Sequence, residues 1–185
     1  TSPYFHSVAH SEAGEREATY RAIALAEVAR APVLIVHVST DEATEEIRRA
    51  QAKGLPVLAE TCPQYVALDA SQLDQPGFEG AKFVCSPPPR TEASREAIWR
   101  GLANGVFQVF SSDHAPYRYD DPNGKMHGGA CCSFDRIVNG IPGLATRMPI
   151  LFSEGVNGGR IDLNQFVRIA ATSPGNSADA ASSHW

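Results

Sequence analysis

The chain has 185 residues, 43% hydrophobic and 20% charged, which is ordinary globular composition and argues against intrinsic disorder. Its net charge of −5 argues against a nucleic-acid-binding surface, and it has neither an apolar run of the roughly 18 residues that span a membrane nor a signal peptide at its start. Its four cysteines lack C-x-x-C spacing and are typical of reduced thiols, so we expect a cytoplasmic protein.

The first part of the chain alternates helix and strand. Residues 12–30 carry apolar side chains at helical spacing. The continuous apolar run 33–38 is typical of a strand that is buried on both faces of a parallel sheet. A capping box that starts at Ser39 predicts a helix to about residue 53, and a second short strand follows at 56–61.

The second part continues this alternation with longer connections. Its expected elements, in order, are a loop at 62–90, a helix from Thr91, a third strand at 106–110, a glycine-rich loop at about 117–142, a helix at 144–156 interrupted near Pro149, and a helix capped by Asp162. Strands that alternate with helices predict an α/β fold with a parallel sheet. Three or four such units are too few for an eight-stranded barrel, but they fit part of one.

Two polar side chains follow strands of this predicted sheet. His37 lies at the end of the first strand, and Asp113 follows the third. In parallel α/β folds, ligands bind and catalysis occurs at the carboxyl ends of the strands. Imidazole and carboxylate together suit zinc or a similar divalent ion. The spacing alone leaves a second interpretation open, in which His37 is a buried histidine bonded to the backbone.

Two loop residues are further candidates. Ser86 precedes three prolines, which stiffen the loop and remove amide donors. Such a loop could present backbone polar groups to a planar polar ligand, or it could be an ordinary connection. Asn139 begins a turn sequence that turn chemistry alone explains. Glu60, at the end of the second strand, we interpret as a supporting partner of the site.

Six segments resemble, in the same order, the dihydropyrimidinase and hydantoinase branch of the amidohydrolase superfamily. They are residues 36–39, 59–65, 78–88, 112–114, 139–143 and 151–155, within a likeness that runs from about residue 4 to 174. The resemblance implies a partial TIM-like (β/α) barrel of the metal-dependent amidohydrolase type. It also implies the reaction, in which cyclic amides such as dihydropyrimidines and hydantoins are opened to N-carbamoyl amino acids.

The resemblance also implies roles for the candidate residues. His37 is similar to a histidine metal ligand, and Asp113 to the aspartate that binds metal and transfers the proton. Ser86 and Asn139 are similar to the residues whose main-chain groups hold the cyclic amide. The family centre is binuclear and usually contains zinc, and full-length relatives are homo-oligomers, typically tetramers.

The ends of the chain depart from the family pattern. The His-x-His pair, the carboxylated lysine and a further histidine of the family have no counterpart here. We therefore expect residues 1–172 to be the C-terminal part of a (β/α)8 barrel, and residues 173–185 to be a disordered or non-native tail. With two metal ligands left, we expect the chain alone to be inactive.

Two alternatives to the hydrolase interpretation remain open. The branch includes non-catalytic scaffold proteins, against which the retained His37 and Asp113 argue. Other cyclic amidohydrolases, such as allantoinases and dihydroorotases, carry different motifs where residues 60–65 and 85–89 stand.

Overall fold

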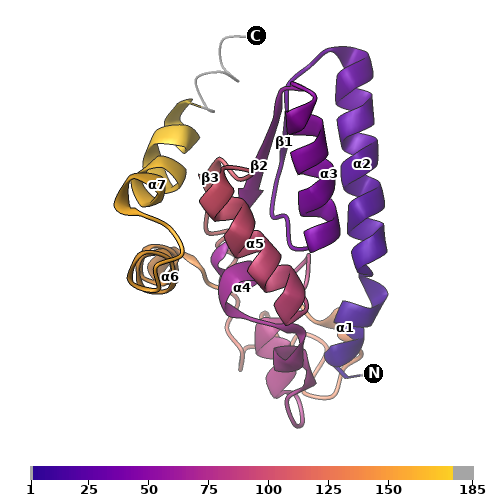
Figure 1. The fold of residues 1–185 in the computed structure, drawn as a ribbon. Helices are drawn as coiled ribbons and strands as arrows, with labels where there is room; N and C mark the ends of the chain where they lie inside the picture. Colours follow the sequence, from indigo (N-terminus) through magenta and orange to yellow (C-terminus); the bar gives the residue numbers. More distant parts are fainter. Residues whose placement is uncertain (1, 177–185) are drawn as a thin grey trace.

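The computed structural model describes residues 2–176, which form a parallel sheet with helices packed beside it (Figure 1). The strands β1 (Val33–Ile35), β2 (Val57–Thr61) and β3 (Val109–Phe110) lie side by side in the order β1-β2-β3. Both pairings are parallel, with Val33 opposite Val57 and Glu60 opposite Val109. The predicted α/β fold with a parallel sheet is confirmed.

Helices connect the strands and continue beyond them. They are α1 (Tyr4–Ala9), α2 (Glu12–Ala29), α3 (Asp41–Ala52), α4 (Pro63–Ala67), α5 (Glu92–Asn104), α6 (Leu144–Ile150) and α7 (Leu163–Val167). Helix α3 packs against β2, and α5 and α2 both lie beside α3 (Figure 1). Their apolar faces meet the strands in the main core, where Ile47, Ile98, Leu102 and Phe110 are fully buried. None of the described helices is long and apolar enough to cross a membrane.

Side-chain caps explain where the longer helices begin. Thr91 caps α5 through the Ser94 amide at 3.2 Å, as the sequence predicts. The expected cap at Ser39 is wrong, because Thr40 caps α3 through the Ala43 amide at 3.1 Å. The Ser39 hydroxyl instead donates to a carboxylate of α2, so it is not available as a cap.

Several expected boundaries are wrong. Strand β1 ends at Ile35, and Leu34 and Val36 are 41% and 43% exposed, so residues 33–38 are not a strand buried on both faces. The reason is that β1 is the edge strand of the described sheet and that one of its faces has no second layer in residues 2–176. Strand β3 is likewise shorter than the expected 106–110.

The connections at 62–90 and 117–142 are more ordered than the loops we expected. The first contains α4 and two short 3-10 turns, η1 (Ala70–Asp74) and η2 (Glu79–Phe83), and the second contains η3 (Phe134–Arg136). The two connections pack on each other in a second core, formed by Leu73, Phe78, Ala81, Val84 and Ile137. Apolar contact between segments distant in sequence therefore orders both.

The helix that the sequence predicts to be interrupted near Pro149 changes its type there but stays helical. Beyond Pro149 the backbone of α6 continues in wide π-type turns, η4 (Leu151–Asn157), and α7 continues in the same way as η5 (Arg168–Thr172). Helical backbone extends through residues 173–176, which belong to the predicted tail. The remainder of that tail, residues 177–185, lies outside the described residues.

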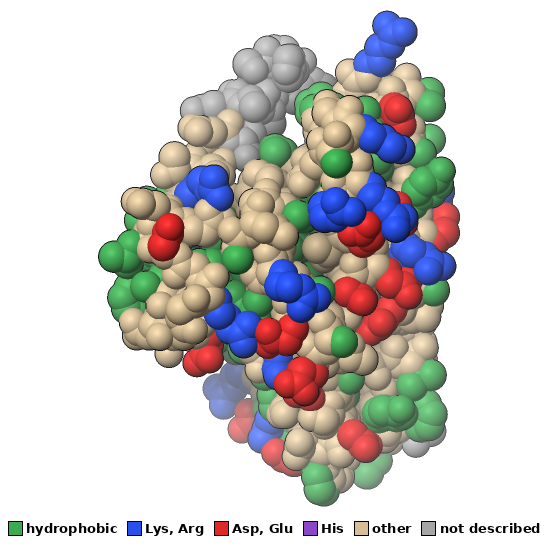
Figure 2. All heavy atoms as spheres, viewed as in Figure 1, with side chains coloured by type: hydrophobic (Ala, Val, Ile, Leu, Met, Phe, Trp, Pro, Cys, Tyr) green, Lys and Arg blue, Asp and Glu red, His purple; other side chains and the backbone are tan. Residues whose placement is uncertain are grey.

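The face that carries α2, α3 and α5 mixes acidic and basic side chains (Figure 2). Ion pairs explain much of the mixture: Glu45 pairs with Arg48 and Arg49 along α3, and Glu96 pairs with Arg160. These side chains are partly exposed to solvent, so each pair contributes little to stability.

Candidate functional site

His37 and Asp113 both lie just after strands, at the carboxyl edge of the sheet. His37 follows β1 with a φ of 43°, and Asp113 follows β3 with a φ of 42°. Arg30 is the only other non-glycine residue between 2 and 176 with a positive φ. This conformation costs about 1–2 kcal/mol per residue, and such strain is concentrated at functional sites. The fold thus holds both predicted residues in unusual backbone conformations at one edge.

A buried ion pair holds the turn that follows His37. The Glu15 carboxylate of α2 accepts from the Ser39 amide at 2.7 Å and from Thr40 at 3.2 Å. Arg90 pairs with Glu15 at 2.9 Å and donates to the Ser39 hydroxyl at 3.0 Å. Because the pair joins α2, the turn after β1 and the end of the Ser86 loop, it sets the position of His37 relative to that loop.

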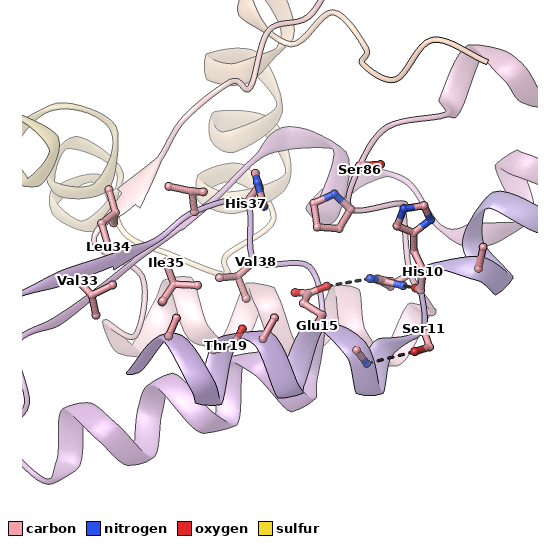
Figure 3. A pocket seen from close by; sticks show the side chains of 17 residues that line it. His10, Ser11, Glu15, Thr19, Val33, Leu34, Ile35, His37, Val38 and Ser86 are labelled. Carbon is pink, nitrogen blue, oxygen red and sulfur yellow. Dashed lines mark hydrogen bonds and ion pairs between the residues drawn. The ribbon is translucent and has the colours of Figure 1, made fainter. Parts of the chain in front are cut away.

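His37 and Ser86 line one side of a pocket between α2 and β1 (Figure 3). The pocket has a volume of about 720 Å³, and the apolar side chains of β1 and two alanines of α2 are part of its lining. Asp113 and Asn139 are not among its lining residues. The structure therefore places His37 and Ser86 around a common space and Asp113 outside it.

Ser86 and Asn139, the two residues predicted to hold a ligand, are in direct contact. The Ser86 hydroxyl donates to Asn139 Oδ1 at 2.9 Å, and the neighbouring Gly140 amide donates to the Val84 carbonyl at 3.0 Å. The Asn139 segment also contacts the segment that follows β3, because the Ala115 amide donates to the Ile141 carbonyl at 3.2 Å. The two ligand-holding candidates and the segment after Asp113 are thus joined.

The backbone around Ser86 is held from three sides. The Val84 carbonyl accepts from Lys125, the Cys85 carbonyl from His6 at 2.8 Å, and the Pro87 carbonyl from Tyr65 at 3.0 Å. Within residues 2–176 the N–H and C=O of Ser86 make no hydrogen bond, and the same is true of the backbone groups of Asn139. The carbonyls beside Ser86 are occupied, whereas its own backbone groups are available to a ligand.

The two thiols nearest the site are unreactive. Burial raises the pKa of Cys85 to about 12, and the Asp113 carboxylate contributes in the same direction. Burial also raises the pKa of Cys62 far above its usual value. Both thiols stay protonated at neutral pH, so neither is a nucleophile.

The described residues alone do not form a metal centre. Between residues 2 and 176 no group of three or more His, Cys, Asp or Glu side chains could hold an ion. Glu60 is engaged otherwise: it accepts from the Ser111 hydroxyl and from the Cys62 thiol at 3.6 Å. Within residues 2–176 no hydrogen bond joins it to His37 or Asp113, so the supporting role that we expected stays a prediction. His37 and Asp113 stay a pair of candidate ligands.

Sequence reasoning missed the residues that support the site. Glu15 and Arg90 meet across 75 positions of the chain, and His6 reaches the Ser86 loop across 79. Lys125 lies in a glycine-rich segment without periodicity. No local pattern marks such contacts, because they depend on how distant segments fold together.

Comparison with known proteins gives a consistent result. No family model matches the chain. It is 43% identical over 174 residues to a D-hydantoinase of Rhizobium radiobacter and 45% identical over 172 residues to a D-hydantoinase of Geobacillus stearothermophilus. These matches cover 94% and 93% of this chain but 37% and 36% of the relatives.

Solved structures agree. The D-hydantoinase from a Bacillus sp. AR9 superposes with a TM-score of 0.90 at 46% identity, over 94% of this chain and 37% of that one. A dihydropyrimidinase from Brevibacillus agri gives 0.88 at 45% identity, over 92% and 36%. The chain spans little more than a third of the relatives' length. Over that segment the chain is similar to D-hydantoinases and a dihydropyrimidinase, and its parallel sheet with flanking helices has the fold of the matching part of their structures.

Proposed function

We propose that this chain forms the substrate-holding and proton-transferring part of a hydrolase that opens cyclic amides, hydantoins or dihydropyrimidines, to N-carbamoyl amino acids. The single observation that carries the proposal is the pair formed by Ser86 and Asn139. Their side chains bond to each other while their backbone groups make no other hydrogen bond in the described chain.

Backbone groups of this kind are complementary to a cyclic amide. The ring of a hydantoin or dihydropyrimidine alternates C=O and N–H groups along one edge. An N–H and a C=O of Ser86 can donate to a ring carbonyl and accept from a ring N–H. Rigid placement of such groups orients a planar ring and lowers the entropic cost of reaction.

Asp113 is the proton-transfer group in this proposal. Asp113 is exposed and follows β3 at the carboxyl edge of the sheet. The carboxylate accepts a proton from the attacking water and delivers it to the ring nitrogen that leaves when the C–N bond breaks. Proton transfer by a positioned side chain contributes typically 10²–10⁴-fold in rate.

The family resemblance implies a binuclear zinc centre with His37 and Asp113 among its ligands. Imidazole and carboxylate are suitable ligands, but two are fewer than the three or four that hold zinc tightly. The described residues do not supply more. No metal-dependent step is therefore assigned to this chain's own residues, and we propose only that His37 and Asp113 contribute ligands.

The alternative candidate is a non-catalytic scaffold related to dihydropyrimidinase. Binding of the ring separates the two candidates. We expect hydantoin or dihydrouracil, titrated into the isotopically labelled chain, to shift the NMR signals of the Ser86 and Asn139 amides, and Asn139→Ala to weaken that binding. A chain with no response at these amides at millimolar ligand would favour the scaffold.

We also propose that the protein is cytoplasmic and assembles as a homo-oligomer, a tetramer by resemblance. Light scattering of the purified chain tests the assembly. A single species with the mass of one chain at all concentrations would contradict it.

A further inference from the structure

Lys125 is a buried cation inside the long connection between Asp113 and Asn139. It is 2% exposed, although the connection around it lies at the surface. A tight turn directs it inward: the Lys125 amide donates to the Arg118 carbonyl at 2.9 Å, and a Cβ on Gly124 would lie 2.1 Å from that same oxygen. Only glycine fits before Lys125, so the local sequence is suited to inserting this side chain.

The ammonium group of Lys125 joins two distant segments. Its Nζ donates to the Val84 carbonyl at 2.7 Å and to the Val138 carbonyl at 2.8 Å. Val84 is two residues before Ser86, and Val138 is the residue before Asn139. The same Val84 carbonyl also accepts from the Gly140 amide. Lys125 therefore binds the backbone next to both Ser86 and Asn139.

The direct bond between Ser86 and Asn139 is too weak to fix their spacing alone. Both residues are exposed, so water competes for the hydroxyl and the amide. The two bonds from Lys125 are charge-assisted and shielded from water, and such bonds are about twice as strong as neutral ones. The spacing of the two backbone segments thus depends on the buried ammonium more than on the surface contact.

The surroundings of Lys125 favour a geometric role. It forms no ion pair within the described chain, and both of its acceptors are backbone carbonyls. Burial lowers its pKa to about 8, and the opposing effect of Cys85 is smaller. A buried cation without a counter-ion costs stability, so its presence calls for an explanation other than stability.

We infer that Lys125 is a positioning residue that sets the distance between Ser86 and Asn139, and hence the width of the slot for the ligand's ring edge. The inference rests on the proposed function for its consequence in ligand binding. The link that the Lys125 ammonium makes between residues 84 and 138 does not depend on that function.

The test compares Lys125→Met with Lys53→Met. Methionine keeps most of the length and the apolar stem but removes the donors, and Lys53 is an exposed lysine at the end of α3, so its replacement controls for charge. Amide hydrogen exchange, followed by NMR, is measured in both variants and in the wild type. We expect at least tenfold faster exchange of the Gly140 amide in Lys125→Met, less than twofold change at Leu102 in the core, and no change in Lys53→Met.

The second measurement is hydantoin binding, which a loss of stability alone would not change in the folded variant. In folded Lys125→Met we expect the Kd for hydantoin to rise at least tenfold, while the exchange rates of the α5 amides stay unchanged. If the wild type binds no hydantoin, the proposed function is wrong. The exchange experiment still tests whether Lys125 holds residues 84 and 138 together.

Three results would overturn the inference. They are unchanged exchange at Gly140 in folded Lys125→Met, equal acceleration throughout the molecule, and an unchanged hydantoin Kd. If Lys125→Met does not fold, the exchange of the Nζ protons is measured in the wild type instead. Exchange at Lys125 as fast as at Lys53 overturns the inference, and exchange at least tenfold slower supports it.

Discussion

Replacing Glu15 by glutamine tests whether the buried ion pair holds the turn that carries His37. In the structure the Glu15 and Arg90 side chains are 12% and 6% exposed. Glutamine keeps one oxygen for the amides of Ser39 and Thr40, but it leaves the Arg90 guanidinium without its counter-charge. Removing one partner of a buried ion pair costs about 3–5 kcal/mol. We expect a loss of that size in the free energy of unfolding.

The same helix contains a matched control. Glu17 pairs with Arg21 at 2.9 Å, but these side chains are 61% and 65% exposed. Because exposed pairs contribute about 0–1 kcal/mol, Glu17→Gln should change stability by less than about 0.5 kcal/mol. The two substitutions are chemically identical and differ in burial.

Urea unfolding followed by circular dichroism measures both variants at neutral pH. The double variant Glu15→Gln/Arg90→Met should be less destabilised than the sum of the single variants, since it also removes the unpaired cation. In Glu15→Gln the Ser39 and Thr40 amides should exchange faster, because the turn after His37 loses its support. A loss below about 1 kcal/mol for Glu15→Gln, or equal effects of the two glutamine substitutions, would refute the reasoning.

Three further predictions follow from buried groups and from the candidate ligands. Burial lowers the pKa of Lys125 from 10.5 to about 8, so between these pH values the unfolded chain binds a proton that the folded chain has lost. The free energy of unfolding should therefore rise with pH across this window by about 3 kcal/mol relative to Lys125→Met. The same pH dependence of the free energy of unfolding in both proteins would contradict this. Gly101→Ala places a Cβ 2.5 Å from the Phe107 ring, which overpacks the core and should cost about 1–3 kcal/mol in thermal unfolding, whereas an unchanged Tm would show that the ring moves freely. The purified chain should hold far less than one equivalent of zinc after dialysis, measured by elemental analysis, since His37 and Asp113 are too few ligands, and stoichiometric zinc would disprove this.

The amino-acid sequence by itself determined the alternation of strands and helices and the edge at which the site residues lie. Apolar runs and capping residues such as Thr91 and Asp162 act locally, so their effects can be predicted without knowing the rest of the fold. The positions of His37 and Asp113 after strands follow from the same local pattern. Parallel pairing then places both at one edge.

Only the tertiary structure decided how these residues are supported. The hydroxyl of Ser39 reads as a cap in sequence, but it donates to Glu15, because α2 packs against the turn and brings a carboxylate there. Lys125 lies in a segment for which the sequence predicts only a glycine-rich loop, yet two segments close around it and their carbonyls replace its water. Hydrogen bonds of this kind join groups that are far apart in sequence, and their energy depends on burial. Burial is a property of the folded chain and not of any local pattern.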